Sequence, residues 1–301
     1  MRILSGAAFA SAVLIPALFE IGFPASTPPT SPAEFDVPRE LTEVPAESGL
    51  TSIRMVTWNI ERGREVQLIG SELARDAVDL CLLQEVDWKT NRTGQADIGV
   101  QLAKRLHLNL SYAIEFEELG QESGQRAFIG QATLTRLPIR KSRVLRFRNQ
   151  SGFWKPHSWI PSNVPLMQRR LGSRIALVTE LEFARHLLVV YNAHLESRSM
   201  GSIQAAQLQE ILGDLKKYPP KTAAIVAGDL NTKYFPSRYL KKLEREGFRS
   251  CTGERIERTH HVAMALDWIF ARGPLNLEGG EVRRDFRGSD HYPVFAKLEA
   301  K

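Results

Sequence analysis

Cysteine is scarce in this 301-residue sequence, which has only Cys81 and Cys251. Two cysteines exclude a disulfide framework and a zinc cluster built on cysteine, and the apolar run LCLL around Cys81 predicts a buried free thiol. The Walker loop, the G-x-G-x-x-G fingerprint and the G-x-S-x-G elbow of serine hydrolases are also missing. Hydrophobic residues make up 43% and charged residues 25%, which excludes a disordered chain and a polytopic membrane protein.

A long uncharged apolar run occurs only at the amino terminus. Residues 3–19 follow a basic residue, which is the pattern of a secretory signal, and the run is slightly short for a membrane span. Residues 24–49 contain six prolines among Ser, Thr and Glu, a composition that buries little surface. We therefore expect an exported protein with a signal peptide or membrane anchor at 1–23, a Pro-rich linker at 24–51 and a folded domain at 52–301. A buried helix of the domain is the alternative for the apolar run.

Acidic residues are unevenly distributed. The first 50 residues hold six acidic and two basic residues, and the other 251 hold 38 basic and 28 acidic residues, a net charge of +10. Between Leu137 and Thr179 there is no Asp or Glu, whereas the same stretch has nine Lys or Arg residues interleaved with Phe153, Trp154 and Trp159. Basic residues attract phosphates and aromatic rings stack on bases, so this pattern favours a nucleic-acid partner. An anionic membrane surface, with the Trp residues inserted, and a solvated hairpin with no partner are the alternatives.

Short apolar runs alternate with amphipathic patterns through the folded region. Strands are expected at 53–60, 79–86, 110–116, 130–139, 143–147, 175–183, 187–195, 222–231, 265–272 and 291–300. Helices are expected at 65–77, 98–107, 202–218 and 236–246. Strands mixed with helices throughout predict a layered α/β protein, with hairpins at 130–147 and 175–195.

At five places in the sequence, an expected strand or the turn next to it ends in polar side chains. These are Asn59, Glu85, His194, Asp229 with Asn231, and Asp290 with His291. A charge at the buried end of a strand is costly unless it is paired, hydrogen-bonded or bound to a metal. Carboxylate and amide oxygens without thiolates suit Mg²⁺ or Mn²⁺ rather than zinc. A hard metal, an acid that aligns water and two imidazoles suit hydrolysis of a phosphate ester.

Seven short strings resemble the motifs of the endonuclease/exonuclease/phosphatase superfamily, which includes DNase I-like nucleases, neutral sphingomyelinases and inositol-polyphosphate 5-phosphatases. They are TWNIERG (57–63), LLQEVD (82–87), GQATLTRLPI (130–139), YNAHLES (191–197), AGDLNT (227–232), LDWIF (266–270) and GSDHYPV (288–294). Each string is weak, but the ordered set is specific and covers residues 53–299. The resemblance implies a four-layer α/β sandwich, in which two packed β-sheets are flanked by helices and the site lies at one end.

The resemblance implies a metal and a water-activating group. Glu85 matches the family's metal-binding glutamate, Asn59 matches the asparagine beside it, and Asp290 matches a further acidic group at the metal. Asp229 matches the aspartate that orients or deprotonates the attacking water. Mg²⁺ or Mn²⁺ is therefore the expected cofactor.

The resemblance also implies groups around the phosphate. Asn231 holds the phosphoryl group, His291 contacts the scissile phosphate with Asp267 as its carboxylate partner, and Arg136 faces a phosphate. His194 matches a second histidine of the DNase I and sphingomyelinase branches, which argues against abasic-site cleavage. Its carboxylate partner stays open among Glu115, Glu117, Glu118 and Glu122.

We therefore expect 52–301 to be the catalytic domain of a metal-dependent phosphodiesterase, a monomer that acts as a nuclease, and more specifically an endonuclease, on DNA or RNA. Arg169 and Arg170, in the acid-free stretch, are expected to contact the substrate backbone. A phospholipid phosphodiesterase or a phosphatase is the alternative substrate class. A non-catalytic binding module is disfavoured because every expected catalytic position is filled.

Overall fold

The computed structural model describes residues 32–301 apart from 122–123, 155–168, 235 and 254. The predicted signal peptide or anchor at 1–23 and residues 155–159 of the aromatic stretch lie outside the described residues. Within the described part of the chain, no helix is long and apolar enough to cross a membrane.

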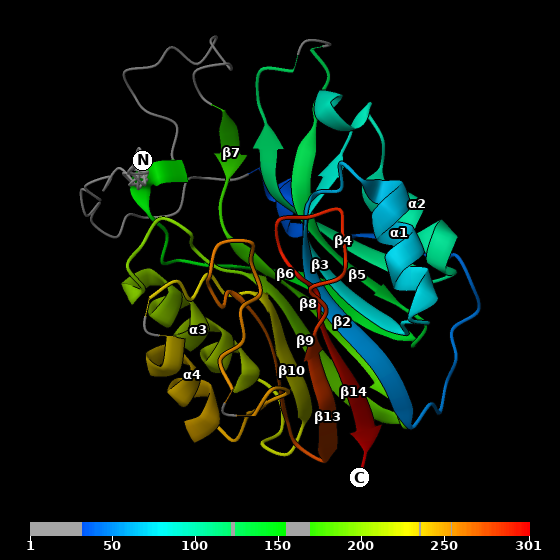
Figure 1. Ribbon diagram of the computed structural model, residues 1–301, viewed down its shortest axis with the longest axis vertical. Helices are drawn as coiled ribbons and strands as arrows, with labels where there is room; N and C mark the ends of the chain where they lie inside the picture. Colours follow the sequence, from blue (N-terminus) through cyan, green and yellow to red (C-terminus); the bar gives the residue numbers. More distant parts are fainter. Residues whose placement is uncertain (1–31, 122–123, 155–168, 235, 254) are drawn as a thin grey trace, which may run out of the picture.

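Two β-sheets form the centre of the molecule (Figure 1). The strands of the first sheet are β1 (Arg39–Leu41), β2 (Ser52–Arg62), β3 (Leu80–Trp88), β4 (Asn109–Glu118), β5 (Phe128–Thr135), β7 (Arg170–Gly172), β13 (Leu275–Val282) and β14 (Val294–Ala300). The strands of the second sheet are β6 (Ile139–Arg146), β8 (Ile175–Phe183), β9 (His186–His194), β10 (Ala223–Asp229), β11 (Arg249–Ser250) and β12 (Asp267–Arg272). The first sheet has the order β1-β4-β5-β3-β2-β14-β13, with β7 paired to β4, and the second has the order β11-β12-β10-β9-β8-β6.

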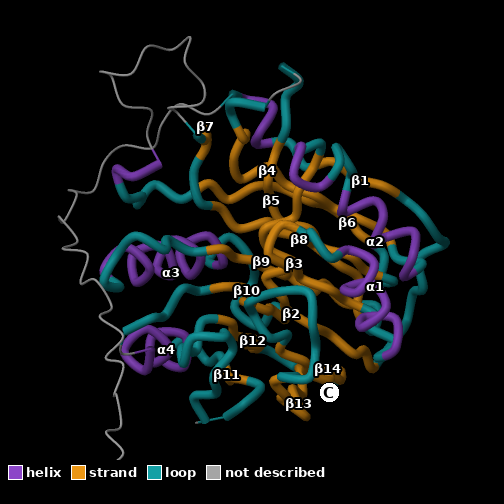
Figure 2. The backbone as a smooth tube through the Cα atoms, turned by 45° about the horizontal axis from the view of Figure 1, so that its top comes forward, coloured by secondary structure: helices purple, strands orange, loops and turns teal. Residues whose placement is uncertain are grey.

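Helices cover the outer face of each sheet, which confirms the expected four-layer sandwich (Figure 2). The first pair is α1 (Val66–Arg75) and α2 (Ile98–Leu106), and the second pair is α3 (Ser202–Leu215) and α4 (Pro236–Arg245). Short 3₁₀ turns occur at η1 (Ala33–Asp36), η2 (Asn91–Thr93) and η3 (Gly152–Trp154). All four expected helices form, and each begins and ends within a few residues of its predicted bounds.

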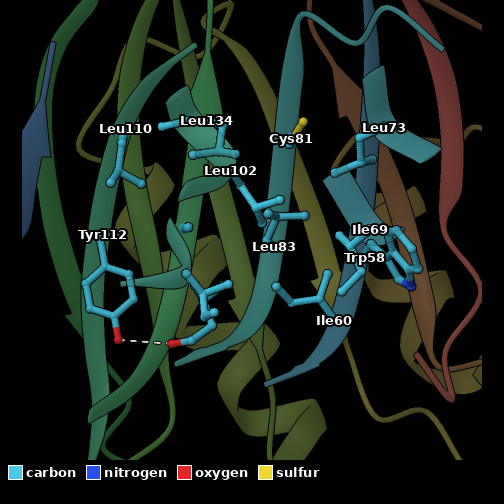
Figure 3. Close-up of a cluster of buried hydrophobic side chains, with 14 of the residues drawn as sticks. Trp58, Ile60, Ile69, Leu73, Cys81, Leu83, Leu102, Leu110, Tyr112 and Leu134 are labelled. Carbon is cyan, nitrogen blue, oxygen red and sulfur yellow. Dashed lines mark hydrogen bonds between the residues drawn. The ribbon is translucent and has the colours of Figure 1, made fainter. Parts of the chain in front are cut away.

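Apolar side chains fill three layers between these elements. Between the first sheet and its helices, Trp58 and Leu83 pack against Ile69 of α1 and Leu102 of α2 (Figure 3). A second cluster lies between the second sheet and α3 with α4, and a third lies between the two sheets. Strands buried on both faces explain why the sequence shows near-continuous apolar runs instead of alternation.

The expected hairpin at 130–147 is wrong. β5 pairs with β3 and β4 in the first sheet, whereas β6 pairs with β8 in the second. Leu137, between the two strands, is buried in the core between the sheets, so the chain passes from one sheet to the other at this point. The next residue, Pro138, has no N–H to donate to a ladder and lies between the end of β5 at Thr135 and the start of β6 at Ile139. The expected hairpin of β8 and β9 does form.

Part of the expected linker is also structured. Phe35 of η1 is fully buried and packs edge-on against Phe128. β1 pairs with β4, and the Arg39 guanidinium lies 3.7 Å from the centre of the Trp88 ring and 2.8 Å from Asp97. The high proline content of this segment did not indicate that Phe35 would be buried or that Arg39 would stack on an aromatic ring. Residues 33–41 therefore belong to the folded domain, not to a spacer.

Candidate active site

Polar strand ends gather at one edge of the sandwich. β2 and β3 run parallel and carry Asn59 and Glu85 near their carboxyl ends. β9 and β10 also run parallel and end at His194 and Asp229, which lie opposite each other in register. On the other side of β10, Asp229 lies opposite Asp267, the first residue of β12. The carboxyl ends of both parallel pairs thus supply one site, and Asn59 joins the two sheets there.

Asp229 is the central group of this site. Its Oδ2 accepts a hydrogen bond from Asn59 Nδ2 at 3.2 Å and lies 3.5 Å from His194 Nε2 and 3.9 Å from His291 Nε2. Its Oδ1 accepts from the backbone N–H of Asn231 at 3.0 Å. Burial raises the pKa of Asp229, but the two histidines and these hydrogen bonds outweigh burial and lower it. The group is therefore a buried carboxylate with imidazoles on two sides.

A close approach of two strands places Asp229 beside His194. Gly228 has φ +136°, and a Cβ there would lie 1.9 Å from the carbonyl oxygen of Ala193. Only glycine allows β10 to approach β9 this closely. The glycine of the AGDLN string is thus part of the geometry of the site.

His291 and Asp267 form a buried pair, as expected. His291 Nδ1 lies 2.8 Å from Asp267 Oδ2, and both side chains are at most 8% exposed. Burial lowers the pKa of His291, but the charge and hydrogen bond of Asp267, together with Asp229 and Asp290, raise it to about 10. The ring is therefore an imidazolium at neutral pH, and its Nε2–H faces Asp229.

The structure selects Glu115 as the partner of His194 and adds an arginine that the sequence did not single out. His194 Nδ1 lies 3.1 Å from Glu115 Oε2, and Arg174 lies 2.6 Å from Glu115 Oε1. The Arg174 guanidinium is also 2.8 Å from His194 Nε2 and donates to Ser197 Oγ at 3.0 Å. Burial raises the pKa of Glu115, but His194 and Arg174 outweigh it and lower the pKa to about 2.

Two of the three expected metal ligands present carboxylates. The side chains of Glu85 and Asp290 are 20% and 45% exposed. Burial raises the pKa of Glu85, but Arg62, 3.6 Å away, and His194 lower it, so the group is an anion. Asn59 instead donates to Asp229, and its side-chain oxygen accepts from the backbone of Glu61 at 3.1 Å. Carboxylate oxygens on Glu85 and Asp290 are the donor type that suits Mg²⁺ or Mn²⁺, whereas Asn59 acts on Asp229. Among the described residues, the groups of ligand atoms that lie within 4.8 Å of one another include Asp290 but not Glu85.

The remaining expected residues divide into two groups. Asn231 lies in the site, with φ +48° and a side-chain N–H that donates to Leu195 O at 3.0 Å. Arg170 lies at the rim, where it pairs with Glu118 at 2.9 Å and lowers the pKa of Glu85. Arg169 is exposed beside it.

Arg136 does not lie in the site, so its expected phosphate contact is wrong. It follows the carboxyl end of β5, which pairs antiparallel with β3, and therefore lies at the opposite end of the first sheet from Glu85. There it pairs with Asp79 at 3.2 Å and Glu47 at 3.1 Å. The LTRLPI string marks the passage between the sheets, not a phosphate contact.

The two-sheet sandwich thus carries at one end a buried carboxylate flanked by two histidines. A family model for the Endonuclease/Exonuclease/phosphatase family matches residues 56–291, and the chain belongs to this family. No curated protein matches the chain.

Solved structures share the fold at low sequence identity. An endonuclease/exonuclease/phosphatase from Beutenbergia cavernae DSM 12333 is 18% identical with a TM-score of 0.62, and the match covers 83% of this chain and 72% of that one. One from Bacteroides vulgatus is 17% identical with a TM-score of 0.60, covering 83% and 100%. SmcL is 14% identical with a TM-score of 0.57, covering 82% and 99%. The fold is thus shared, whereas function must be argued from the site.

Proposed function

We propose that the chain is an exported, divalent-metal-dependent phosphodiesterase that acts as an endonuclease on DNA or RNA. The observation that carries this proposal is Asp229, a buried carboxylate held between His194 and His291, which contact the carboxylates of Glu115 and Asp267 respectively. Family membership supports hydrolysis of a phosphate ester, and the site supplies a base beside two groups that stabilise a phosphate.

Each residue of the site has a separate role in the proposed hydrolysis. The Asp229 carboxylate accepts a proton from water as the water oxygen bonds to phosphorus. The bond from phosphorus to the leaving oxygen breaks, and that oxygen keeps the electron pair and takes a proton from solvent. The His291 imidazolium, fixed by Asp267, donates toward the phosphoryl oxygens and stabilises their added charge. Asn59 and the Asn231 backbone orient Asp229. A divalent metal held by Glu85 and Asp290 would neutralise charge on the phosphate.

Charge supports a nucleic acid as substrate. The domain from residue 51 onward carries 38 basic and 28 acidic residues. Arg62 and Arg170 lie close enough to Glu85 to lower its pKa, and each also pairs with a carboxylate, Arg62 with Glu85 and Arg170 with Glu118. The net positive charge of the domain as a whole is therefore what attracts a polyanion. We further propose that the protein acts as a monomer outside the cytosol, which cell fractionation and light scattering would test.

A substrate panel with a matched control tests the proposal. Duplex DNA, single-stranded DNA, RNA and a small chromogenic phosphodiester are incubated with Mg²⁺, with Mn²⁺ and with excess chelator. We expect cleavage that the chelator abolishes and that Glu85→Gln lowers by about 10²-fold or more, because the carboxylate is lost from the metal site. Glu281→Gln, an exposed carboxamide control on β13, is expected to keep full activity. Full activity in chelator would refute metal dependence.

A phospholipid is the second candidate, favoured by apolar side chains near the site. Phe153 is 43% exposed and Met200 is 60% exposed, six residues after His194. SmcL shares the fold. Vesicles of sphingomyelin or phosphoinositide belong in the same panel. Lipid turnover without nucleic-acid cleavage at low salt would replace the nuclease proposal with this one.

A further inference from the structure

One loop beside the site is tied to the start of β12 and to the segment that carries Asp290 and His291. The Thr259 hydroxyl accepts from the backbone N–H groups of Leu266 at 2.8 Å and Asp267 at 3.0 Å. The backbone N–H of His261 donates to Asp290 O at 2.8 Å, and an antiparallel bridge joins residues 260 and 291. The loop therefore places the His260 side chain against Asp290 and His291 whenever the site is folded.

Hydrogen bonding fixes the tautomer of His260. Its Nδ1 accepts from the backbone N–H of Val262 at 3.0 Å, so Nδ1 carries no proton and Nε2 carries it in the neutral ring. Nε2 lies 3.4 Å from Asp290 Oδ2, the distance of a long hydrogen bond. The Nε2–H group is thus aimed at the Asp290 carboxylate, and the ring is only 16% exposed.

The same ring also contacts His291. The two ring centres are 4.6 Å apart with an interplanar angle of 85°, an edge-to-face contact. His291 is held at Nδ1 by Asp267, and His260 restricts the remaining freedom of that ring. One side chain therefore touches both a carboxylate that fits a metal and the imidazole that faces Asp229.

His260, Asp290 and His291 lie close enough to suggest a metal triad, but their protons argue against one. A histidine ligand must offer a lone pair, whereas Nδ1 of His260 already accepts from Val262 and its Nε2 carries hydrogen. His291, with Nδ1 hydrogen-bonded to Asp267, keeps only Nε2 for a ligand, so it is His260 that opposes a shared metal. The three residues therefore cannot bind a metal together unless the hydrogen bond from Val262 to His260 is broken.

We propose that His260 is a positioning residue that orients the Asp290 carboxylate for a divalent metal and supports the His291 ring. The role resembles the outer hydrogen-bond partners of metal ligands, with a histidine holding a carboxylate instead of the reverse. The inference rests on the proposed metal-dependent function of this site.

Three variants separate positioning from packing. His260→Leu removes the N–H donor, His260→Gln keeps a side-chain N–H near the position of Nε2, and His261→Leu is the neighbouring control, whose ring faces Tyr292. Mn²⁺ affinity is measured by electron paramagnetic resonance of free Mn²⁺ without substrate. We expect His260→Leu to weaken Mn²⁺ binding by about 10–100-fold. We expect His260→Gln to restore most of the affinity and His261→Leu to stay within about twofold of the wild type.

Nitrogen chemical shifts of labelled histidine give an independent signature. His260 should show an unprotonated Nδ1 and a protonated Nε2, and the Nε2 signal should move in Asp290→Asn. Unchanged Mn²⁺ affinity in His260→Leu, or equal losses in the Leu and Gln variants together with a lower Tm, would overturn the inference. Because Mn²⁺ binding needs no substrate, a wild type that binds Mn²⁺ but cleaves nothing would refute the proposed function and not the role of His260.

Discussion

Two histidine–carboxylate pairs flank Asp229, and they are built differently. His291 has Asp267 to itself, on a 2.8 Å contact between two buried side chains. His194 shares Glu115 with Arg174, which makes the shorter contact at 2.6 Å. One pair concentrates the charge of a carboxylate on an imidazole, whereas the other divides it between an imidazole and a guanidinium. The difference indicates that the positive charge next to Asp229 comes from His291 on one side and from Arg174, beside His194, on the other side.

The two pairs also respond to pH in opposite directions. The pKa of His291 is raised from 6.5 to about 10, so its contribution to stability is complete below about pH 6.5 and is lost as the pH rises through 10. The pKa of Glu115 is lowered from 4.5 to about 2, so its contribution is complete above about pH 4.5 and is lost as the pH falls toward 2. Both contributions are therefore complete only between about pH 4.5 and pH 6.5.

The largest expected effect comes from the unshared pair. His291→Ala and Asp267→Ala should each lower kcat by about 10²–10⁴-fold, because the imidazolium needs both its ring and its carboxylate. The double variant should cost little more than either single one, since residues that act as a unit are not additive. Steady-state kinetics on a small phosphodiester test this. Losses that simply multiply would show that the two residues act independently.

Arg174 tests the shared pair. Arg174→Leu should lower the free energy of unfolding by about 3–5 kcal/mol, because it leaves Glu115 buried without its guanidinium. Arg140→Leu is the matched control, since the exposed contact of Arg140 with Glu182 should be worth about 1 kcal/mol or less. Urea unfolding of both variants measures the difference. Equal losses would show that burial of the Arg174 pair does not set its effect.

Acid unfolding sharpens the comparison further. The shift of the Glu115 pKa from 4.5 to about 2 corresponds to about 3 kcal/mol of stability, lost between about pH 5 and pH 2. Glu115→Gln should remove this part of the pH dependence. Unfolding free energies at several acidic pH values test it, and a variant with the same acid slope as the wild type would contradict the assignment.

The smallest effect is expected far from both pairs. Arg136→Ala should leave kcat within about twofold and change stability by about 1 kcal/mol or less, because it removes only half-exposed ion pairs at the opposite end of the sheet. Kinetics and thermal unfolding test this. A tenfold loss of kcat would instead support the expected contact between Arg136 and a phosphate.

Most of the fold could be predicted from the sequence because buried strands leave apolar runs. The runs at 79–86 and 222–231 became β3 and β10. β13 was missed because its residues, LNLEGGEV, are mostly half-buried or exposed, so they leave no continuous apolar run. The 130–147 hairpin failed because sequence neighbours can join different sheets, and only tertiary packing decides which.

The sequence predicted the site residues that lie in recognisable motifs. It did not predict the residues that reach the site only through pairing between distant parts of the chain. The AGDLN and GSDH strings pointed to Asp229 and His291, which the structure brings within 3.9 Å. Glu115 could not be chosen among its neighbours, because β4 has a register shift between Ile114 and Phe116 that turns the side chain toward His194.

The acid-free stretch was misleading for a related reason. Its arginines pair with carboxylates from elsewhere in the chain: Arg140 with Glu182, Arg143 with Asp214, Arg146 with Asp36, Arg170 with Glu118 and Arg174 with Glu115. Local charge therefore overstated how many cations face a substrate. Arg174, the most buried of them, could not be told from the others by sequence.

The structured segment at 33–41 sets the reach of a tether. If the chain is anchored through 1–23, the connection between the anchor and the first described element, η1, has nine residues (24–32) and not the 28 of 24–51. At about 3.3–3.6 Å per extended residue, its maximum length falls from about 100 Å to about 30 Å. A domain held this closely would search only a thin layer above a membrane, so substrates in that layer would meet the site far more often than those in bulk solution.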